Sequence, residues 1–77
     1  MKPAAKLRKR SVSIAGHRTS VSLEAEFWDA LSEIAAARDR PVAALIAGID
    51  RREGRQTSLS SAVRLFVLAY FRQKAGK

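Results

Sequence analysis

One short segment constrains this chain more than any other feature, because it predicts a strand with only helical patterns after it. Residues 18–23, RTSVSL, alternate with the period of a β-strand that has one buried face. A strand cannot satisfy its own backbone hydrogen bonds, so this one needs a partner strand. We predict that it pairs antiparallel with a copy of itself about a two-fold axis. In that arrangement Thr19, Val21 and Leu23 face the helices, and Arg18, Ser20 and Ser22 face solvent.

A weaker alternation precedes this segment, in residues 11–15. Val12 and Ile14 alternate there with serines, but in the register opposite to that of residues 18–23, so one continuous strand would send the two apolar sets to opposite faces. Gly16 lies at the break. Either a turn or bulge around Gly16 corrects the register, so that the earlier segment joins the ribbon or a hairpin, or that segment is a lead-in to a single functional strand. We favour the second interpretation.

From Glu24 onward the hydrophobic period is that of a helix. The first helix is expected to end near Arg38, with Asp39 in the left-handed conformation common at helix stops. Pro41 suits the first position of a second helix, which is expected to run to about Arg52. The apolar stripes are Phe27, Leu31, Ile34 and Ala35 in the first helix, and Val42, Leu45, Ile46 and Ile49 in the second.

A third helix is predicted from Leu59 to about Gln73. In the connector before it, Gly54 is suited to end the second helix, and Thr57 or Ser58 to cap the third. The stripe of this helix is wide, because Leu65, Leu68, Ala69 and Phe71 extend the set Leu59, Ala62, Val63, Phe66, Val67 and Tyr70. Such a helix is buried on more than one side, which favours a second chain.

The chain is short for an independent fold. With 77 residues, no Cys and one His, it has neither disulfides nor a zinc site to supplement a small core. Self-association is the remaining way to enlarge this small core, so we expect a homodimer. The predicted fold class is mainly α, with one N-terminal strand paired antiparallel across the homodimer and three helices per chain. The predicted dimer core consists of Val21, Leu23, Phe27, Leu31, Ile34, Leu45, Ile46 and Ile49.

The charge distribution indicates a polyanionic partner. The chain has 15 Lys or Arg against 7 Asp or Glu, a net charge of +8, and residues 1–23 contain no acid. Nucleic acid is the first candidate; a membrane surface is disfavoured because residues 1–10 contain little apolar anchor. We expect residues 1–10 to form a flexible basic arm and residues 11–72 the folded domain, with its additional C-terminal helix at about 58–72. Residues 73–77 are expected to form a polar tail.

The sequence contains little that indicates an enzyme. His17 is the one histidine, no Cys accompanies it, and neither a glycine-rich phosphate loop nor a Gly-x-Ser-x-Gly motif occurs. We therefore expect no enzyme, no metal and no cofactor. The basic N-terminus is not followed by the apolar region of a secretory signal, and the longest apolar run, Leu65–Phe71, is far below the ~20 residues of a membrane span. The expected location is the cytoplasm, on the nucleoid.

The order of these parts resembles the ribbon-helix-helix family of the Arc and MetJ repressors. The resemblance rests on RTSVSL at 18–23, on EAEFWDALSEIAAA at 24–37 and on a second helix from Pro41. The longer run from RSVSIAGHRTSVSLE through FWDALSEIAA to LSSAVRLFVL is similar to a bacterial subgroup with an extra C-terminal helix. The resemblance implies a homodimer whose paired strands enter the major groove of double-stranded DNA, where Arg18, Ser20 and Ser22 contact bases.

The resemblance also implies that the start of the second helix holds a DNA phosphate with its free backbone N–H groups. The link here departs from the family pattern of Gly followed by Ser or Thr, because it reads Asp39-Arg40-Pro41, and Pro41 has no N–H. The phosphate contacts are assigned to the basic arm and to this helix start: Lys6, Arg8, Lys9, Arg10, Arg40, Pro41, Val42 and Ala43.

These features predict a sequence-specific DNA-binding protein, most simply a bacterial transcriptional repressor. The alternative is a protein-interaction module, antitoxin-like or a scaffold dimer, whose C-terminal helix binds a partner protein. The apolar breadth of that helix supports the alternative, but burial inside the dimer explains the same breadth more simply.

Overall fold

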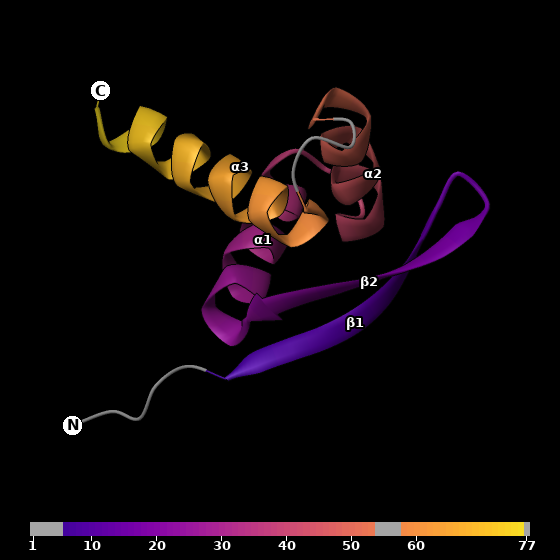
Figure 1. The fold of residues 1–77 in the computed structure, drawn as a ribbon. Coiled ribbons are helices and arrows are strands. Elements are labelled where there is room, and N and C mark those ends of the chain that lie inside the picture. Colours follow the sequence, from indigo (N-terminus) through magenta and orange to yellow (C-terminus); the bar gives the residue numbers. More distant parts are fainter. Residues whose placement is uncertain (1–5, 54–57, 77) are drawn as a thin grey trace.

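The computed structural model describes residues 6–53 and 58–76, and in them a two-stranded hairpin is followed by three helices. The elements are β1 (Leu7–Ile14), β2 (His17–Glu24), α1 (Ala25–Ala37), α2 (Val42–Glu53) and α3 (Leu59–Ala75). The hairpin is a long twisted ribbon, and the helices gather on one side of it (Figure 1). Among the described residues, no helix is long and apolar enough to cross a bilayer.

The hairpin pairs two strands of the same chain. β1 runs antiparallel to β2, with Leu7 opposite Glu24 at one end and Ile14 opposite His17 at the other. The two residues between the strands, Ala15 and Gly16, have φ angles of 51° and 82°, and a positive φ at both central residues is the mark of the type I′ turn favoured in tight hairpins. With this turn, even-numbered residues of β1 and odd-numbered residues of β2 share a face, which explains the change of register in the sequence.

The hairpin corrects three expectations. The prediction of a single strand per chain is wrong, and so is the preferred view of residues 11–15 as a lead-in; the alternative, a turn at Gly16, is confirmed. Residues 7–10 are not part of a flexible arm, because they form the first half of β1. Their backbone has a partner that short-range sequence patterns do not reveal, namely the edge of β2. Of the expected arm, residues 1–5 lie outside the described residues.

The helix boundaries follow from local backbone chemistry. After α1, the Asp39 N–H donates to the Ala36 carbonyl and the Arg40 N–H to the Ala35 carbonyl, while Asp39 has φ 56°. These are the two bonds and the left-handed residue of a Schellman motif, as expected for Asp39. Of the two predicted caps of α3, Ser58 is confirmed, since its hydroxyl accepts a hydrogen bond from the Ser61 N–H at 3.1 Å, and Thr57 lies outside the described residues.

The start of α2 and the end of α3 differ from the prediction. α2 begins at Val42, one residue after Pro41, whose carbonyl accepts from the N–H groups of the first turn. α3 continues to Ala75, so residues 73–75, expected in a polar tail, are helical. Gly54, expected to end the second helix, lies outside the described residues.

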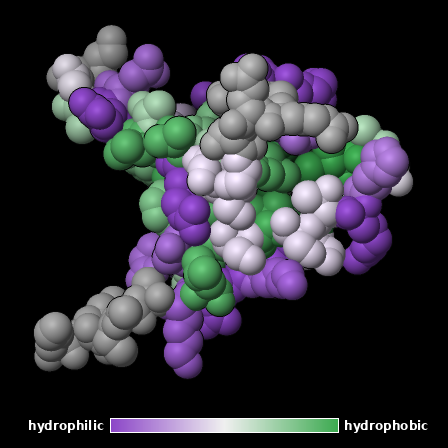
Figure 2. Space-filling model, viewed as in Figure 1, coloured by the Kyte–Doolittle hydropathy of each residue, from purple (hydrophilic) through white to green (hydrophobic). Residues whose placement is uncertain are grey.

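The core lies between the hairpin and the three helices of one chain. Every residue predicted for the dimer core is buried within this single chain except Phe27, which is partly buried, so their place in a dimer remains a prediction. α3 contributes Ala62, Val63 and Val67 to the same core, so its inner side is covered without a second chain. Its outer side is different: Leu65 is 60% exposed and Leu68 is 50% exposed. Figure 2 shows hydrophobic surface over α3 and hydrophilic residues at both ends of the hairpin.

Candidate nucleic-acid interface

The hairpin presents one polar face away from the helices. Val21 and Leu23 are fully buried on its inner side, so their neighbours along β2 point outward, as the alternation predicts. Residues that face each other across an antiparallel pair share a side of the sheet, and the register therefore adds three residues of β1 to this surface. We call this surface the outer face: Lys9, Ser11 and Ser13 of β1 lie opposite Ser22, Ser20 and Arg18 of β2.

The chemistry of the outer face is that of hydroxyl groups and cations. Its cations, Lys9 and Arg18, are exposed and lie on different strands near opposite ends of the hairpin. The one acid at its border, Glu24, accepts a 3.0 Å hydrogen bond from the Arg64 side chain of α3. This bond lowers the pKa of Glu24, assisted by the residue's own backbone N–H and opposed by partial burial. Glu24 is thus an ionised but paired group, and the face is open to an anionic partner.

Ser22 differs from the other residues of the outer face because α3 holds its backbone. The Ser22 N–H donates to the Ser60 hydroxyl at 3.1 Å, and its carbonyl lies 3.5 Å from the guanidinium of Arg64. Ser22 is half-buried, whereas Arg18 and Ser20 are exposed. Backbone N–H groups alternate between the two edges of a strand, so Arg18 and Ser20 direct theirs to the same edge as Ser22. α3 covers that edge of β2 at Ser22.

The predicted phosphate contacts of the arm are divided between the two sides of the hairpin. Lys9 belongs to the outer face, and exposed Lys6 immediately precedes β1. Arg8 and Arg10 alternate with Lys9 and lie on the helix side, where the Arg10 guanidinium stacks 4.8 Å from the centroid of the Trp28 ring. The structure therefore does not place Arg8 and Arg10 with the predicted base contacts.

The start of α2 holds the other predicted phosphate contacts. The Arg40 N–H is used in the Schellman motif, and the Pro41 carbonyl accepts from the N–H groups of Ala44 and Leu45 at 3.0 and 3.2 Å. Val42 and Ala43 are the first two residues of the helix, where backbone N–H groups have no partner within the helix. None of these residues belongs to the outer face, so the predicted site residues lie in three places: on the outer face, on the helix side of the hairpin and at the start of α2.

Sequence reasoning missed two features of the hairpin, one on its outer face and one on its inner side. Ser11 and Ser13 join the outer face only because β1 pairs with β2, and a turn at residues 15–16 is the signal that finds them. Trp28, beside the predicted stripe of its helix, is 3% exposed and anchors β1 from the inside. Its indole Nε1 donates to the Arg8 carbonyl, a contact between residues 20 positions apart.

Comparison with known proteins agrees with this architecture. The sequence matches the model of the ribbon-helix-helix domain over residues 7–71. A similar solved structure is that of an uncharacterized protein from Bordetella pertussis Tohama I, with a TM-score of 0.80 and 33% sequence identity; the likeness covers 94% of this chain and 61% of that chain. No curated protein matches the sequence. Since the family match includes both strands and most of the helical region, the chain belongs to the ribbon-helix-helix domain family.

Proposed function

We propose that this protein is a sequence-specific DNA-binding protein that regulates transcription, most simply as a repressor. The observation that carries the proposal is the outer face, a two-stranded ribbon whose exposed side chains are serines, Lys9 and Arg18. The major groove admits a two-stranded ribbon, an Arg donates twice to guanine, and a Ser hydroxyl contacts either donors or acceptors of base edges. Arg18, Ser20 and Ser22 are the proposed base contacts.

The positive charge of the chain supports binding to the DNA backbone. Lys6 and Lys9 flank the outer face, and the net charge of +8 raises the local concentration of the protein at a polyanion. Each phosphate that the protein neutralises steepens the decline of affinity with salt by about 0.9 log unit per log unit of salt concentration. We therefore expect strongly salt-dependent binding, with the start of α2 as a second phosphate contact.

The proposed binding unit is a homodimer, in keeping with a family whose members generally bind DNA as dimers. One edge of β2 is paired with β1, and the other edge is covered by α3 at Ser22, which leaves its stretch at Arg18 and Ser20 for a second copy. Two copies paired there antiparallel bring their two β2 strands together around a two-fold axis, so the proposed base contacts of both copies lie on one central two-stranded ribbon. A two-fold protein reads a palindromic site.

The test is selection of bound sequences from a random duplex pool at two salt concentrations, followed by binding measurements on variants. We expect a palindrome to be enriched at the higher salt. Arg18→Ala is expected to lose about 1–3 kcal/mol of binding to that sequence while its affinity for random DNA changes little. Arg10→Ala is the matched control, because it removes an arginine from the other side of the same hairpin. Equal discrimination by wild type and Arg18→Ala would remove the outer face from the mechanism.

A second candidate function is supported by the outer side of α3. Leu65 and Leu68 are exposed although α3 already contributes to the core, and exposed apolar residues of this size mark interaction surfaces. In this view α3 binds a partner protein and the hairpin binds DNA or a second copy. Replacing both leucines by Asn distinguishes the two candidates: unchanged DNA affinity and oligomeric mass together with lost repression in cells would favour the partner-binding role.

A further inference from the structure

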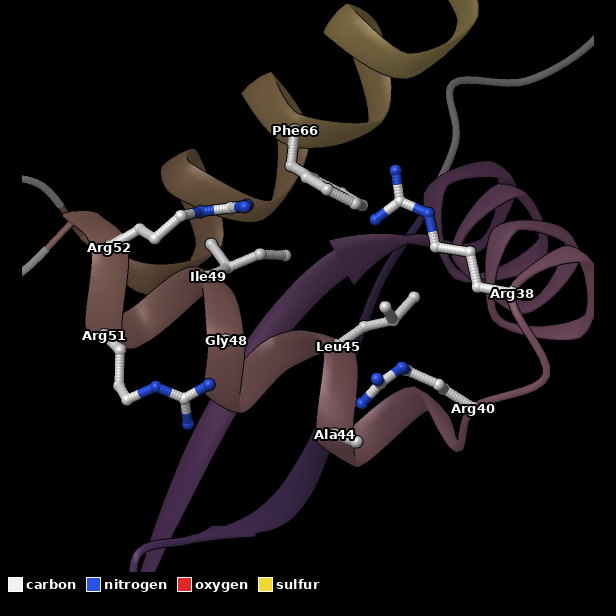
Figure 3. Close-up of a pocket in the computed structure, with 9 residues that line it drawn as sticks. All are labelled: Arg38, Arg40, Ala44, Leu45, Gly48, Ile49, Arg51, Arg52 and Phe66. Atoms are coloured by element: carbon white, nitrogen blue, oxygen red, sulfur yellow. The ribbon is translucent and has the colours of Figure 1, made fainter.

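We propose that a groove between the link after α1, helix α2 and helix α3 binds a small ligand that carries two linked phosphate groups. The groove has a volume of ≈ 270 Å³, just below the range of about 300–1,000 Å³ that is usual for small-molecule sites and suited to a small anion. None of its lining residues comes from the hairpin, so this site is separate from the outer face, and it shares only Arg40 with the phosphate contacts proposed at the start of α2. It is lined by Arg38, Arg40, Ala44, Leu45, Gly48, Ile49, Arg51, Arg52 and Phe66 (Figure 3).

The floor of the groove is one side of α2, and Gly48 keeps it open. A Cβ added at Gly48 would meet only the Arg51 guanidinium, at 3.8 Å, so the space above this residue is free of other side chains. Ala44 adds little bulk, while Leu45 and Ile49 belong to the buried core and keep the floor rigid. The groove is thus a hollow formed by small residues over a packed core.

The rim of the groove carries four guanidinium groups, and its described lining residues include no carboxylate. Arg38 and Arg40 come from the link after α1 at one end, and Arg51 and Arg52 come from the last turn of α2 at the other end (Figure 3). Among the side chains that the structure describes, those of residues 6–52 and 58–76, the one ion pair is that of Arg64 with Glu24, so none of the four is paired with a described acid. Four like charges around one hollow repel one another, and an anion between them relieves that repulsion.

Phe66 of α3 fixes two of these cations in place. The Arg38 guanidinium lies 5.4 Å and the Arg52 guanidinium 5.7 Å from the centroid of the Phe66 ring, and both side chains extend toward it from opposite ends of the groove (Figure 3). A guanidinium held against an aromatic face loses less freedom when a ligand binds. Their arrangement before binding is therefore close to what an anion requires.

The arrangement of the four arginines identifies the ligand chemistry. A guanidinium donates paired N–H bonds to phosphate oxygens, and arginine is the residue best suited to this planar contact. Since one pair of arginines lies at each end of the groove, two phosphate groups joined to each other satisfy both pairs. Free diphosphate compounds and neighbouring phosphates of a nucleic-acid backbone share this chemistry. The separation from the outer face favours the free compound.

The test is a titration of the full chain with inorganic pyrophosphate, followed by calorimetry and by NMR of backbone amides at constant ionic strength. We expect saturable binding with one ligand per chain, with shifts at Leu45, Gly48 and Ile49, and much weaker binding of orthophosphate. Arg51→Gln is expected to weaken binding about tenfold or more, because a charge-assisted hydrogen-bond donor is lost. Gly48→Glu, which brings a carboxylate into the groove, is expected to abolish binding, whereas Gly48→Ala retains it.

Several outcomes would overturn the proposal. These are the absence of saturable binding, equal binding of orthophosphate, or binding that survives both Arg51→Gln and Gly48→Glu in variants with native circular dichroism. Shifts of the same amides by a DNA duplex but not by pyrophosphate would assign the groove to nucleic-acid phosphates instead. Arg18→Ala, measured in parallel, is expected to bind pyrophosphate normally, so failure of the groove and failure of the proposed DNA-binding face are distinguished.

Discussion

The indole Nε1 of Trp28 donates a 2.9 Å hydrogen bond to the backbone carbonyl of Arg8, so that helix α1 holds strand β1 from the inner side of the hairpin. The Trp28 side chain is 3% exposed, and the Arg10 guanidinium covers its ring at 4.8 Å. Ile14 is the one buried residue of β1, and Val12 is partly buried. Because the side chains in the first half of β1 are exposed, the hydrogen bond from the indole is what attaches this part of the strand to α1.

Trp28→Phe is expected to destabilise the protein by about 1–2 kcal/mol, since it removes this hydrogen bond and part of a buried ring while the site remains aromatic. Urea unfolding followed by circular dichroism measures the change. Arg10→Ala removes only the stacked cation and is expected to cost less than about 1 kcal/mol. If Trp28→Phe unfolds at the same urea concentration as the wild type, the indole does not anchor β1.

Ala15→Asn is expected to stabilise the hairpin by about 0.5–1 kcal/mol. Ala15 has φ 51°, a left-handed conformation that Asn adopts more readily, and Asn-Gly is the favoured pair for a type I′ turn. The free energy of unfolding in urea is the measurement. The matched control is Gly16→Ala, where φ is 82° and nothing lies near an added Cβ, so its expected loss of about 1–2 kcal/mol arises from backbone strain alone. A loss of stability in Ala15→Asn would contradict the turn geometry.

The pair of Glu24 and Arg64 is expected to make stability fall in acid. The hydrogen bond from Arg64 lowers the pKa of Glu24 below its ordinary 4.5, so the folded state favours the ionised form. The resulting stabilisation is fully present above the ordinary pKa and is lost as pH falls through the lower pKa of the folded protein. Unfolding midpoints measured between neutral pH and about pH 3 test this, since the fall should be shallower in Glu24→Gln and in Arg64→Gln. An acid dependence identical to that of the wild type would exclude the pair as its source.

Asp39→Gly is expected to stabilise the protein by about 0.5–1 kcal/mol. Asp39 closes the Schellman motif after α1 with φ 56°, a conformation that glycine adopts without steric cost. Thermal unfolding provides the comparison, with Asp39→Ala as the control that removes the same charge but retains the Cβ. We expect Asp39→Ala to be less stable than Asp39→Gly by about 1 kcal/mol. Equal stability of the two variants would show that charge, and not backbone conformation, decides the effect.

Local sequence patterns were sufficient to predict which face of β2 is buried and where helices α1 and α3 end or begin. Val21 and Leu23 are buried and Arg18 and Ser20 are exposed, as the alternation of β2 requires. Ser58 caps α3 as predicted, because the cap depends on residues three positions apart. The same holds for Asp39 after α1. Each of these features depends on interactions within one strand or one helical turn.

The partner strand of β2 was not predictable in this way. The first half of β1, from Leu7 to Arg10, is exposed and, apart from Leu7, basic, so its composition is that of a flexible arm. It is a strand because its backbone pairs with β2 and because Trp28 reaches it from α1. The turn residues Ala15 and Gly16 give only a weak hairpin signal, since the first of them is not the Asn or Asp typical of such turns.

By itself the sequence determined the helical repeats, their caps, the buried face of β2 and the basic character of the chain. Only the tertiary structure decided that β1 and β2 of one chain form the ribbon, that α3 covers the edge of β2 at Ser22, and that four arginines surround one groove. The physical reason is sequence distance. Periodicity and caps reflect contacts between residues a few positions apart, whereas the contact of Ser22 with Ser60 joins residues 38 positions apart and depends on the path of the whole chain.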